Sequence, residues 1–115
     1  MNKYLWQGRQ IAPPEFFGPP ELRIAREKAR DLRITLLQKD DQQLFEELIG
    51  SYETLKEFGE LDLILLDLER YVVGQPLKAK IRHQYAMALQ ANGNLDEAEK
   101  EYRFITVLDH VNPFL

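Results

Sequence analysis

One stretch of eight residues occurs twice in the chain, and this recurrence constrains the fold more than any other feature. Residues 55–62 read LKEFGELD and residues 89–96 read LQANGNLD, 34 residues later, with Leu, Gly, Leu and Asp at the same places. A period of about 34 residues is typical of arrays of helical hairpins. Gly59 and Gly93 lie where a helix would end and the chain must turn, which favours a residue without a Cβ. Each copy therefore predicts a helix, a tight turn and a second helix.

The spacing of apolar residues predicts an all-α fold. In residues 20–38 the apolar side chains recur every three or four positions, which is typical of one face of a helix. Similar patterns continue to the end of the chain. Residues 61–73 are apolar on almost all sides, so we expect this helix to be the most buried and to form the centre of the fold. The five expected helices cover residues 20–38, 41–58, 61–73, 77–91 and 95–109.

Residues 1–19 differ from the rest and predict an extended arm that precedes a helical domain of residues 20–115. Proline pairs at 13–14 and 19–20 disfavour a helix here. The arm is nevertheless too apolar for a solvated tail. We expect it to pack on the helices, and the alternative is that it docks into a partner's groove. Its apolar residues are Tyr4, Leu5, Trp6, Ile11, Phe16 and Phe17.

Composition limits the chemistry that the chain can perform. The 115 residues include no cysteine, which excludes disulfides, thiolate catalysis and cysteine metal sites. There is no signal-peptide pattern and no run of 18 apolar residues, so we expect a soluble, cytoplasmic protein unless the chain is a fragment of a larger one. The net charge of −4 divides into +3 for residues 1–40 and −7 for residues 41–115. This asymmetry suggests that the halves attract each other, within one molecule or between two.

The residues favour neither catalysis nor binding of metals, nucleic acids or membranes. His83 and His110 are the only histidines and lie on different expected helices, without an evident third ligand, so we expect no metal and no other cofactor. No glycine-rich phosphate loop exists, and the carboxylates have the spacing of solvated helix faces, so we do not expect an enzyme. The arginines of residues 23–33 are interleaved with three acids, which favours a solvated face over nucleic acid. The apolar stripe of that helix has no Trp or Phe to enter a membrane.

Two segments, residues 45–78 and 79–112, together resemble the tetratricopeptide repeat family. The second has the family's turn and helix start at residues 93–98 (GNLDEA), and Ala98 with Tyr102 has its small-then-aromatic spacing. The first keeps Leu55, Gly59 and a final Pro76 but has Ile64 and Leu68 at the small and aromatic positions. Upstream both copies depart from the family, which favours Trp, Leu-Gly and Tyr there. The resemblance implies a right-handed stack of antiparallel helix pairs, with residues 20–38 as a capping helix.

The resemblance also implies a concave groove that binds a peptide or a partner's helix. The chain would then be a protein-interaction adaptor or scaffold. Acids on the groove favour a basic ligand, and Ile49 and Met87 favour an apolar anchor. Ile49 and Glu53 stand where some family members need Lys and Asn to hold a carboxylate, so that activity is not expected. The expected groove residues are Glu46, Ile49, Glu53, Lys56, Glu57, Lys80, His83, Met87 and Gln90.

An alternative is a structural assembly subunit, in which the arm fills its own or a neighbour's groove. Terminal repeats expose an apolar face unless something caps them. At the C-terminal end we expect such a face to be covered by the arm or by a second subunit. A further hypothesis is that His83 faces Glu53 and senses pH. The expected capping or oligomer face consists of Phe104, Ile105, Leu108, Val111 and Phe114.

Overall fold

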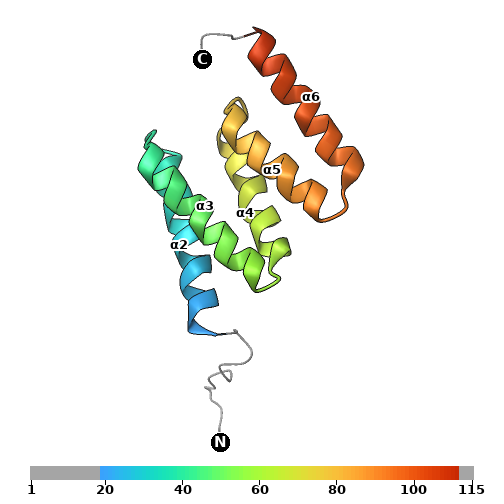
Figure 1. Ribbon diagram of the computed structural model, residues 1–115. Coiled ribbons are helices and arrows are strands. Elements are labelled where there is room, and N and C mark those ends of the chain that lie inside the picture. Colours follow the sequence, from blue (N-terminus) through green and yellow to red (C-terminus); the bar gives the residue numbers. More distant parts are fainter. Residues whose placement is uncertain (1–18, 112–115) are drawn as a thin grey trace, which may run out of the picture.

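The computed structural model describes residues 19–111, and in this part of the chain all regular structure is α-helical (Figure 1). Each helix begins and ends within two residues of the predicted bounds, so the all-α prediction is confirmed. Residues 1–18 of the expected arm, and Phe114, lie outside the described residues. The helices are α2 (Pro20–Leu36), α3 (Gln42–Glu57), α4 (Leu61–Gly74), α5 (Ala79–Ala91) and α6 (Leu95–Val111).

Local sequence explains where the first two of these helices begin. Pro19 is extended, with φ −65° and ψ 159°, and Pro20 takes the first helical position, where its missing N–H has no intrahelical partner to lose. Asp41 caps α3, because its side chain accepts a hydrogen bond of 3.1 Å from the backbone N–H of Leu44. The proline pair and the Asp41 cap therefore account for the residues at which α2 and α3 begin.

The recurring stretch forms the same turn twice. Gly59 and Gly93 have φ of 78° and 85°, the left-handed region that favours glycine. The next residue in each copy donates its backbone N–H to the carbonyl five residues earlier, from Glu60 to Leu55 and from Asn94 to Leu89, at 2.9 Å in both cases. This is the Schellman arrangement that ends many helices. The predicted turns are therefore confirmed.

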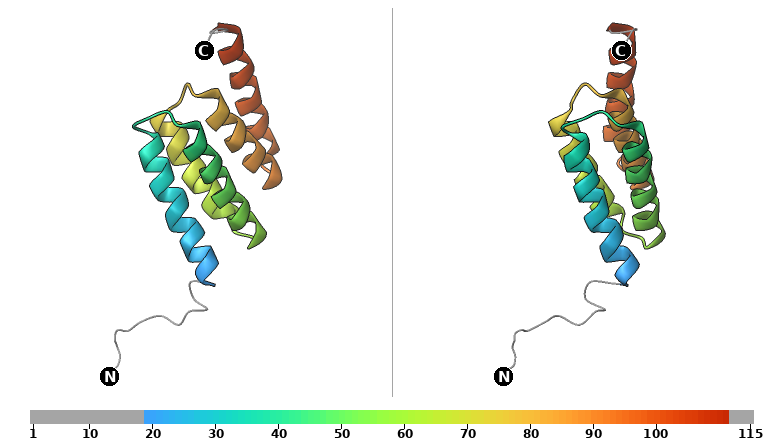
Figure 2. Two further views of the ribbon diagram at one scale, coloured as in Figure 1. Left: turned by 60° about the vertical axis from the view of Figure 1, so that its left-hand side comes forward. Right: turned by 90° about the vertical axis from the view of Figure 1, so that its left-hand side faces the viewer.

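The helices form two layers, with α2 and α4 on one side and α3 and α5 on the other (Figure 2). The closest packing joins α2 to α3 and α5 to α6, and α4 lies between these pairs in contact with α2, α3 and α5. The sequence repeat pairs α3 with α4 instead, but their contact is sparser than that of α2 with α3. The two copies are therefore not packed as equivalent hairpins.

The main core joins α2, α3, α4 and α5, and it corrects the expectation for α4. Four residues of α4 are buried, but Leu66 is 45% exposed and Val73 is 77% exposed. In a fold of two layers one side of every helix lies at the surface, so some of the apolar side chains of α4 are exposed to solvent. The prediction that α4 is the most buried helix is therefore wrong, since α3 buries five residues. The largest fully buried side chains are Leu36, Leu48, Leu55, Leu68, Tyr71 and Ile81.

The burial pattern of α4 predicts unequal effects of truncation along it. Leu68 is 2% exposed, so Leu68→Ala should lower the free energy of unfolding by about 2–5 kcal/mol, as for a buried leucine replaced by a cavity. Val73→Ala, at the exposed end of the same helix, should change it by no more than about 0.5 kcal/mol. Urea unfolding followed by circular dichroism measures both. Equal losses would contradict the described packing of α4.

The two glycine turns predict a second difference in stability, which depends on backbone conformation and not on steric room for a side chain. A Cβ added at Gly59 or Gly93 would meet nothing within 4 Å, so only the backbone conformation penalises alanine there. Each substitution should cost roughly 1–2 kcal/mol of stability. Gly50, inside α3, also has open space, and Gly50→Ala should instead stabilise the protein by roughly 0.5–1 kcal/mol. Thermal unfolding of the three variants tests this, and a stabilising Gly59→Ala would refute the turn geometry.

Candidate functional site

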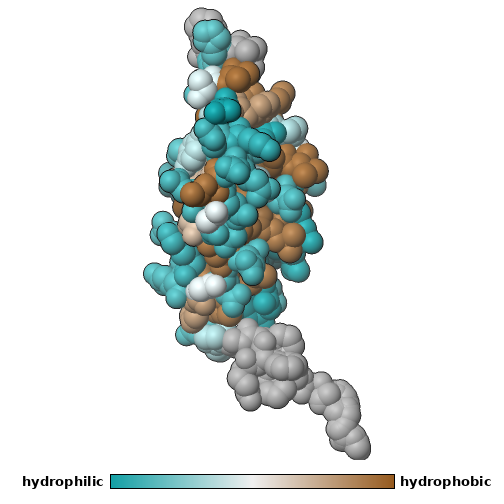
Figure 3. Space-filling view, turned by 90° about the vertical axis from the view of Figure 1, so that its right-hand side faces the viewer, coloured by the Kyte–Doolittle hydropathy of each residue, from teal (hydrophilic) through white to brown (hydrophobic). Residues whose placement is uncertain are grey.

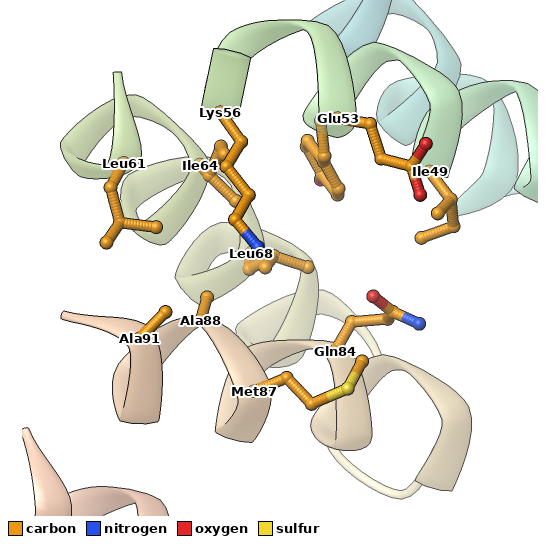
Figure 4. A pocket seen from close by; sticks show the side chains of 11 residues that line it. Ile49, Glu53, Lys56, Leu61, Ile64, Leu68, Gln84, Met87, Ala88 and Ala91 are labelled. Carbon is orange, nitrogen blue, oxygen red and sulfur yellow. The ribbon is translucent and has the colours of Figure 1, made fainter. Parts of the chain in front are cut away.

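A groove lies where α3, α4 and α5 meet, and its side chains converge on one hollow (Figure 4). The hollow has a volume of about 190 Å³. Ligand pockets for drug-sized molecules usually exceed about 300 Å³, so this one suits a single large side chain better than a small-molecule ligand. The lining residues are Ile49, Tyr52, Glu53, Lys56, Leu61, Ile64, Leu68, Gln84, Met87, Ala88 and Ala91.

The groove arises from matching stripes on its two walls. The lining residues of α3 run from Ile49 to Lys56 at positions i, i+3, i+4 and i+7, and those of α5 run from Gln84 to Ala91 at the same spacing. This spacing places four side chains on one helix face. On α5 two of the four are alanines, Ala88 and Ala91, whose short side chains leave room between the helices.

The floor of the groove is apolar and its rim is charged. Leu68, Ile64 and Tyr52 form the floor and are 2%, 5% and 5% exposed. Glu53 and Lys56 are exposed at the rim, both from α3. Such an arrangement can hold an apolar side chain by burial and can select its neighbours by charge.

The structure brings together four of the nine expected groove residues, namely Ile49, Glu53, Lys56 and Met87. Met87 remains 40% exposed and lies on the α5 wall. Glu46 and Glu57 are exposed on α3 but do not line the hollow. Glu46 instead accepts a hydrogen bond of 3.3 Å from the side chain of Gln42, one turn earlier.

The other three expected residues, all on α5, have different neighbours. The ring of His83 lies edge-on to Tyr102 of α6, 5.9 Å between centroids, so His83 does not face Glu53 as expected. Gln90 accepts a hydrogen bond of 3.2 Å from the hydroxyl of the same tyrosine. The ammonium of Lys80 lies 4.4 Å from the centre of the Phe45 ring. Helix α5 is thus turned so that Gln84 and Ala91, one position beyond the expected ones, reach the groove.

The small residues of α5 are the sequence feature from which this rotation could have been predicted. Ala88 and Ala91 lie on the α5 face opposite α3 and α4, where close approach of helices favours short side chains. The expected stripe followed the repeat period and so placed His83 where Ile49 stands in the first copy. Contacts of α5 with Tyr102 and Phe45, which are distant in sequence, contribute to the angle at which α5 is set.

The expected apolar face near the C-terminus is largely covered by its own hairpin. Leu108 is 8% exposed, and the guanidinium of Arg82, from α5, lies 4.1 Å from the centre of the half-buried Phe104 ring. Ile105 is also half-buried, while the Val111 side chain lies outside the described residues. Seen from the α6 side, hydrophobic residues alternate with hydrophilic ones and form no continuous patch in that view (Figure 3). Among the described side chains of α6, the exposed large apolar ones are instead Leu95 and Val107.

A buried polar chain runs beside the groove and joins three helices. Tyr52 of α3 donates its hydroxyl to Asp67 of α4, which also accepts a bond of 2.7 Å from Nε of Arg33 in α2. The Arg33 and Asp67 side chains are only 10% and 13% exposed. Burial and the neighbouring Asp67 carboxylate hold the pKa of Tyr52 far above its usual value, so its hydroxyl stays a donor. The expectation that Arg33 lies on a solvated face is therefore wrong.

Tyr71 is buried as deeply but without such a partner. Its side chain is fully buried, and within residues 19–111 its hydroxyl forms no hydrogen bond. Burial and, to a lesser extent, Asp40 raise its pKa to about 12. Burial also raises the pKa of Tyr85, with Glu69 as the next cause. The two buried tyrosines Tyr52 and Tyr71 therefore differ in whether their hydroxyl is satisfied.

The described residues contain no cluster of three or more His, Asp or Glu side chains that could hold a metal ion. Nor does any helix between residues 19 and 111 have the length and apolar character needed to cross a membrane. Comparisons of the chain with protein-family models, with curated proteins and with solved structures found no match.

The two tyrosines make a matched pair of substitutions. Tyr52→Phe removes a hydrogen bond to a buried carboxylate and should lower the free energy of unfolding by about 1.5–3 kcal/mol. Tyr71→Phe removes a buried hydroxyl that has no partner in the described residues, and should leave stability unchanged or raise it by about 1 kcal/mol. Urea unfolding at neutral pH measures both. Greater damage from Tyr71→Phe would show that Tyr71, not Tyr52, holds the polar contact.

Proposed function

We propose that this chain is a protein-interaction module whose α3–α4–α5 groove receives an apolar side chain of a partner peptide or helix. The observation that carries the proposal is the apolar floor of Tyr52, Ile64 and Leu68, open to solvent and about the size of one large side chain. Two walls with the same helical spacing can hold a segment along their length. Met87 suits such a contact, because its flexible side chain adapts to the shape of what it covers.

The charges around the groove favour a basic partner. Glu53 lines the rim, and Glu46 and Glu57 lie exposed on the same helix. The rim also carries Lys56, and Lys80 of α5, which does not line the groove, is already engaged by Asp40 at 3.8 Å and by Gln42 at 3.0 Å. Complementary charge at a rim steers association and selects partners more than it adds affinity. The proposed ligand is therefore a segment with Lys or Arg beside an apolar anchor.

The resemblance to tetratricopeptide repeats supports the same proposal from the residues. That family binds peptides on the surface formed by the first helix of each pair, and α3 and α5 are the first helices of the two sequence copies. The two Schellman turns 34 residues apart agree with this assignment of the copies.

The groove can be tested with partners captured from the source cells by the tagged chain and identified by mass spectrometry. The double variant Glu53→Lys with Glu57→Lys should weaken binding by about tenfold at low salt, and less at high salt, because rim charges are screened. Met87→Ala should weaken it about threefold to tenfold at any salt. Glu97→Lys with Glu99→Lys, on α6, makes the same change of charge away from the groove and is the matched control.

If the groove variants and the control behave alike, the groove is not the binding surface. Self-association of the chain, seen by sedimentation, would then favour the structural alternative, an assembly subunit. That alternative has its own observation, since Leu95 and Val107 of α6 are 62% and 52% exposed.

A further inference from the structure

A second hollow, of about 310 Å³, lies between α2 and α4, and arginine dominates it. Four arginines and two acids line it, in a protein whose net charge is −4. The local excess of positive charge is therefore opposite to that of the whole chain. The lining residues are Arg26, Glu27, Ala29, Arg30, Arg33, Leu55, Leu63, Leu66, Asp67 and Arg70.

The hollow has an apolar base between two charged walls. Leu55 and Ala29 are 1% and 2% exposed and close its base, while Leu66 is 45% exposed at its surface. Helices α2 and α4 run in the same direction along it (Figure 1). The arginines thus come from two helices and line a hollow whose base is apolar.

Arg33 is the fixed element of the hollow. Its side chain is 10% exposed, and among residues 19–111 it forms its hydrogen bond through Nε alone, with Asp67. The two terminal amino groups of the guanidinium are left for a ligand, in an orientation that the buried pair has already set. Arginine recognises carboxylates best through such paired N–H donors.

The three other arginines are available as well. Within the described residues Arg26 and Arg70 form no ion pair, and Arg30 contacts only the adjacent Asp31, at 3.4 Å. Arg30 and Asp31 have side chains 57% and 69% exposed, so this pair contributes little.

We propose that this hollow binds an acidic segment of a partner protein. Its carboxylates pair with Arg26, Arg30 and Arg70 and with the free amino groups of Arg33, while an apolar side chain packs against Leu63 and the exposed Leu66. Nucleic acid fits less well, because its backbone offers nothing to an apolar floor and the walls include Glu27 and Asp67.

This surface is distinct from the groove, although both use α4. Leu61, Ile64 and Leu68 line the groove, and Leu63, Leu66 and Arg70 line the hollow. The second set is the first shifted by two residues, which is about 200° around a helix. The hollow therefore lies on the other side of α4, and the chain can hold two segments of opposite charge at once.

The test uses the full chain and a fluorescent peptide of about 15 residues, with Glu and Leu at helical spacing. Its counterpart has Gln in place of every Glu. Fluorescence anisotropy should show the Glu peptide binding at least about tenfold more tightly than the Gln peptide, because charge-assisted hydrogen bonds to guanidinium are lost in the latter. Arg30→Gln with Arg70→Gln should weaken binding of the Glu peptide by about tenfold, and circular dichroism should show that this surface variant stays folded.

Two controls distinguish binding in the hollow from general attraction to basic side chains and from binding in the groove. Arg23→Gln with Arg103→Gln removes the same charge from exposed arginines outside the hollow and should leave the affinity for the Glu peptide within about twofold. Met87→Ala, in the groove, should also leave it unchanged, so failure here and failure of the groove are distinguishable. Equal binding of the Glu and Gln peptides, equal losses in both double variants, or tighter binding of a single-stranded oligonucleotide of matched length than of the Glu peptide would overturn the proposal.

Discussion

Asp67 is the residue on which the arrangement of the helices most depends, because it joins α4 to both of its neighbours on the N-terminal side. It accepts hydrogen bonds from Arg33 of α2 and from Tyr52 of α3, and all three side chains are largely buried. A buried carboxylate without partners would cost several kcal/mol, so this one is stable only where both donors reach it. The contact of α4 with α3 is otherwise sparse. The polar chain therefore ties α4 to α2 and α3, the two neighbours that it contacts more sparsely than it contacts α5.

That position creates both surfaces. Tyr52 belongs to the floor of the groove, while Asp67 and Arg33 belong to the walls of the hollow, so one hydrogen-bonded chain passes from one site to the other. The second copy has a related contact 34 residues later. Glu101 of α6 accepts two bonds, of 2.8 and 3.1 Å, from Arg82 of α5. In each copy, an acidic residue at the same position of the second helix accepts hydrogen bonds from a side chain of the preceding helix.

The sequence predicted local structure better than it predicted how the helices face one another. Helix bounds and the turns at Gly59 and Gly93 follow from apolar periodicity and backbone freedom, which depend on nearby residues. The rotation of α5 depends instead on residues that are distant in sequence. His83 contacts Tyr102, 19 positions away, and Lys80 contacts Phe45, 35 positions away. Arg33 shows the same limit. Within a run of arginines nothing in the sequence marks it as the one that meets a buried acid, so seven of the eleven groove-lining residues and all of the hollow required the fold.

The positions of the helices explain how the charge asymmetry of the chain is used. Attraction between the basic N-terminal part and the acidic remainder is partly used inside the molecule, by Arg33 with Asp67 and by Lys28 with Glu47 at 3.8 Å. Arg26 and Arg30 of α2 gather with Arg70 on one side of α4, and Glu46, Glu53 and Glu57 of α3 remain exposed on or near the groove. Two surfaces of opposite sign on one thin two-layer fold cannot neutralise each other, because the core separates them. Charge that is not used in folding therefore remains at the surface on both sides of α4.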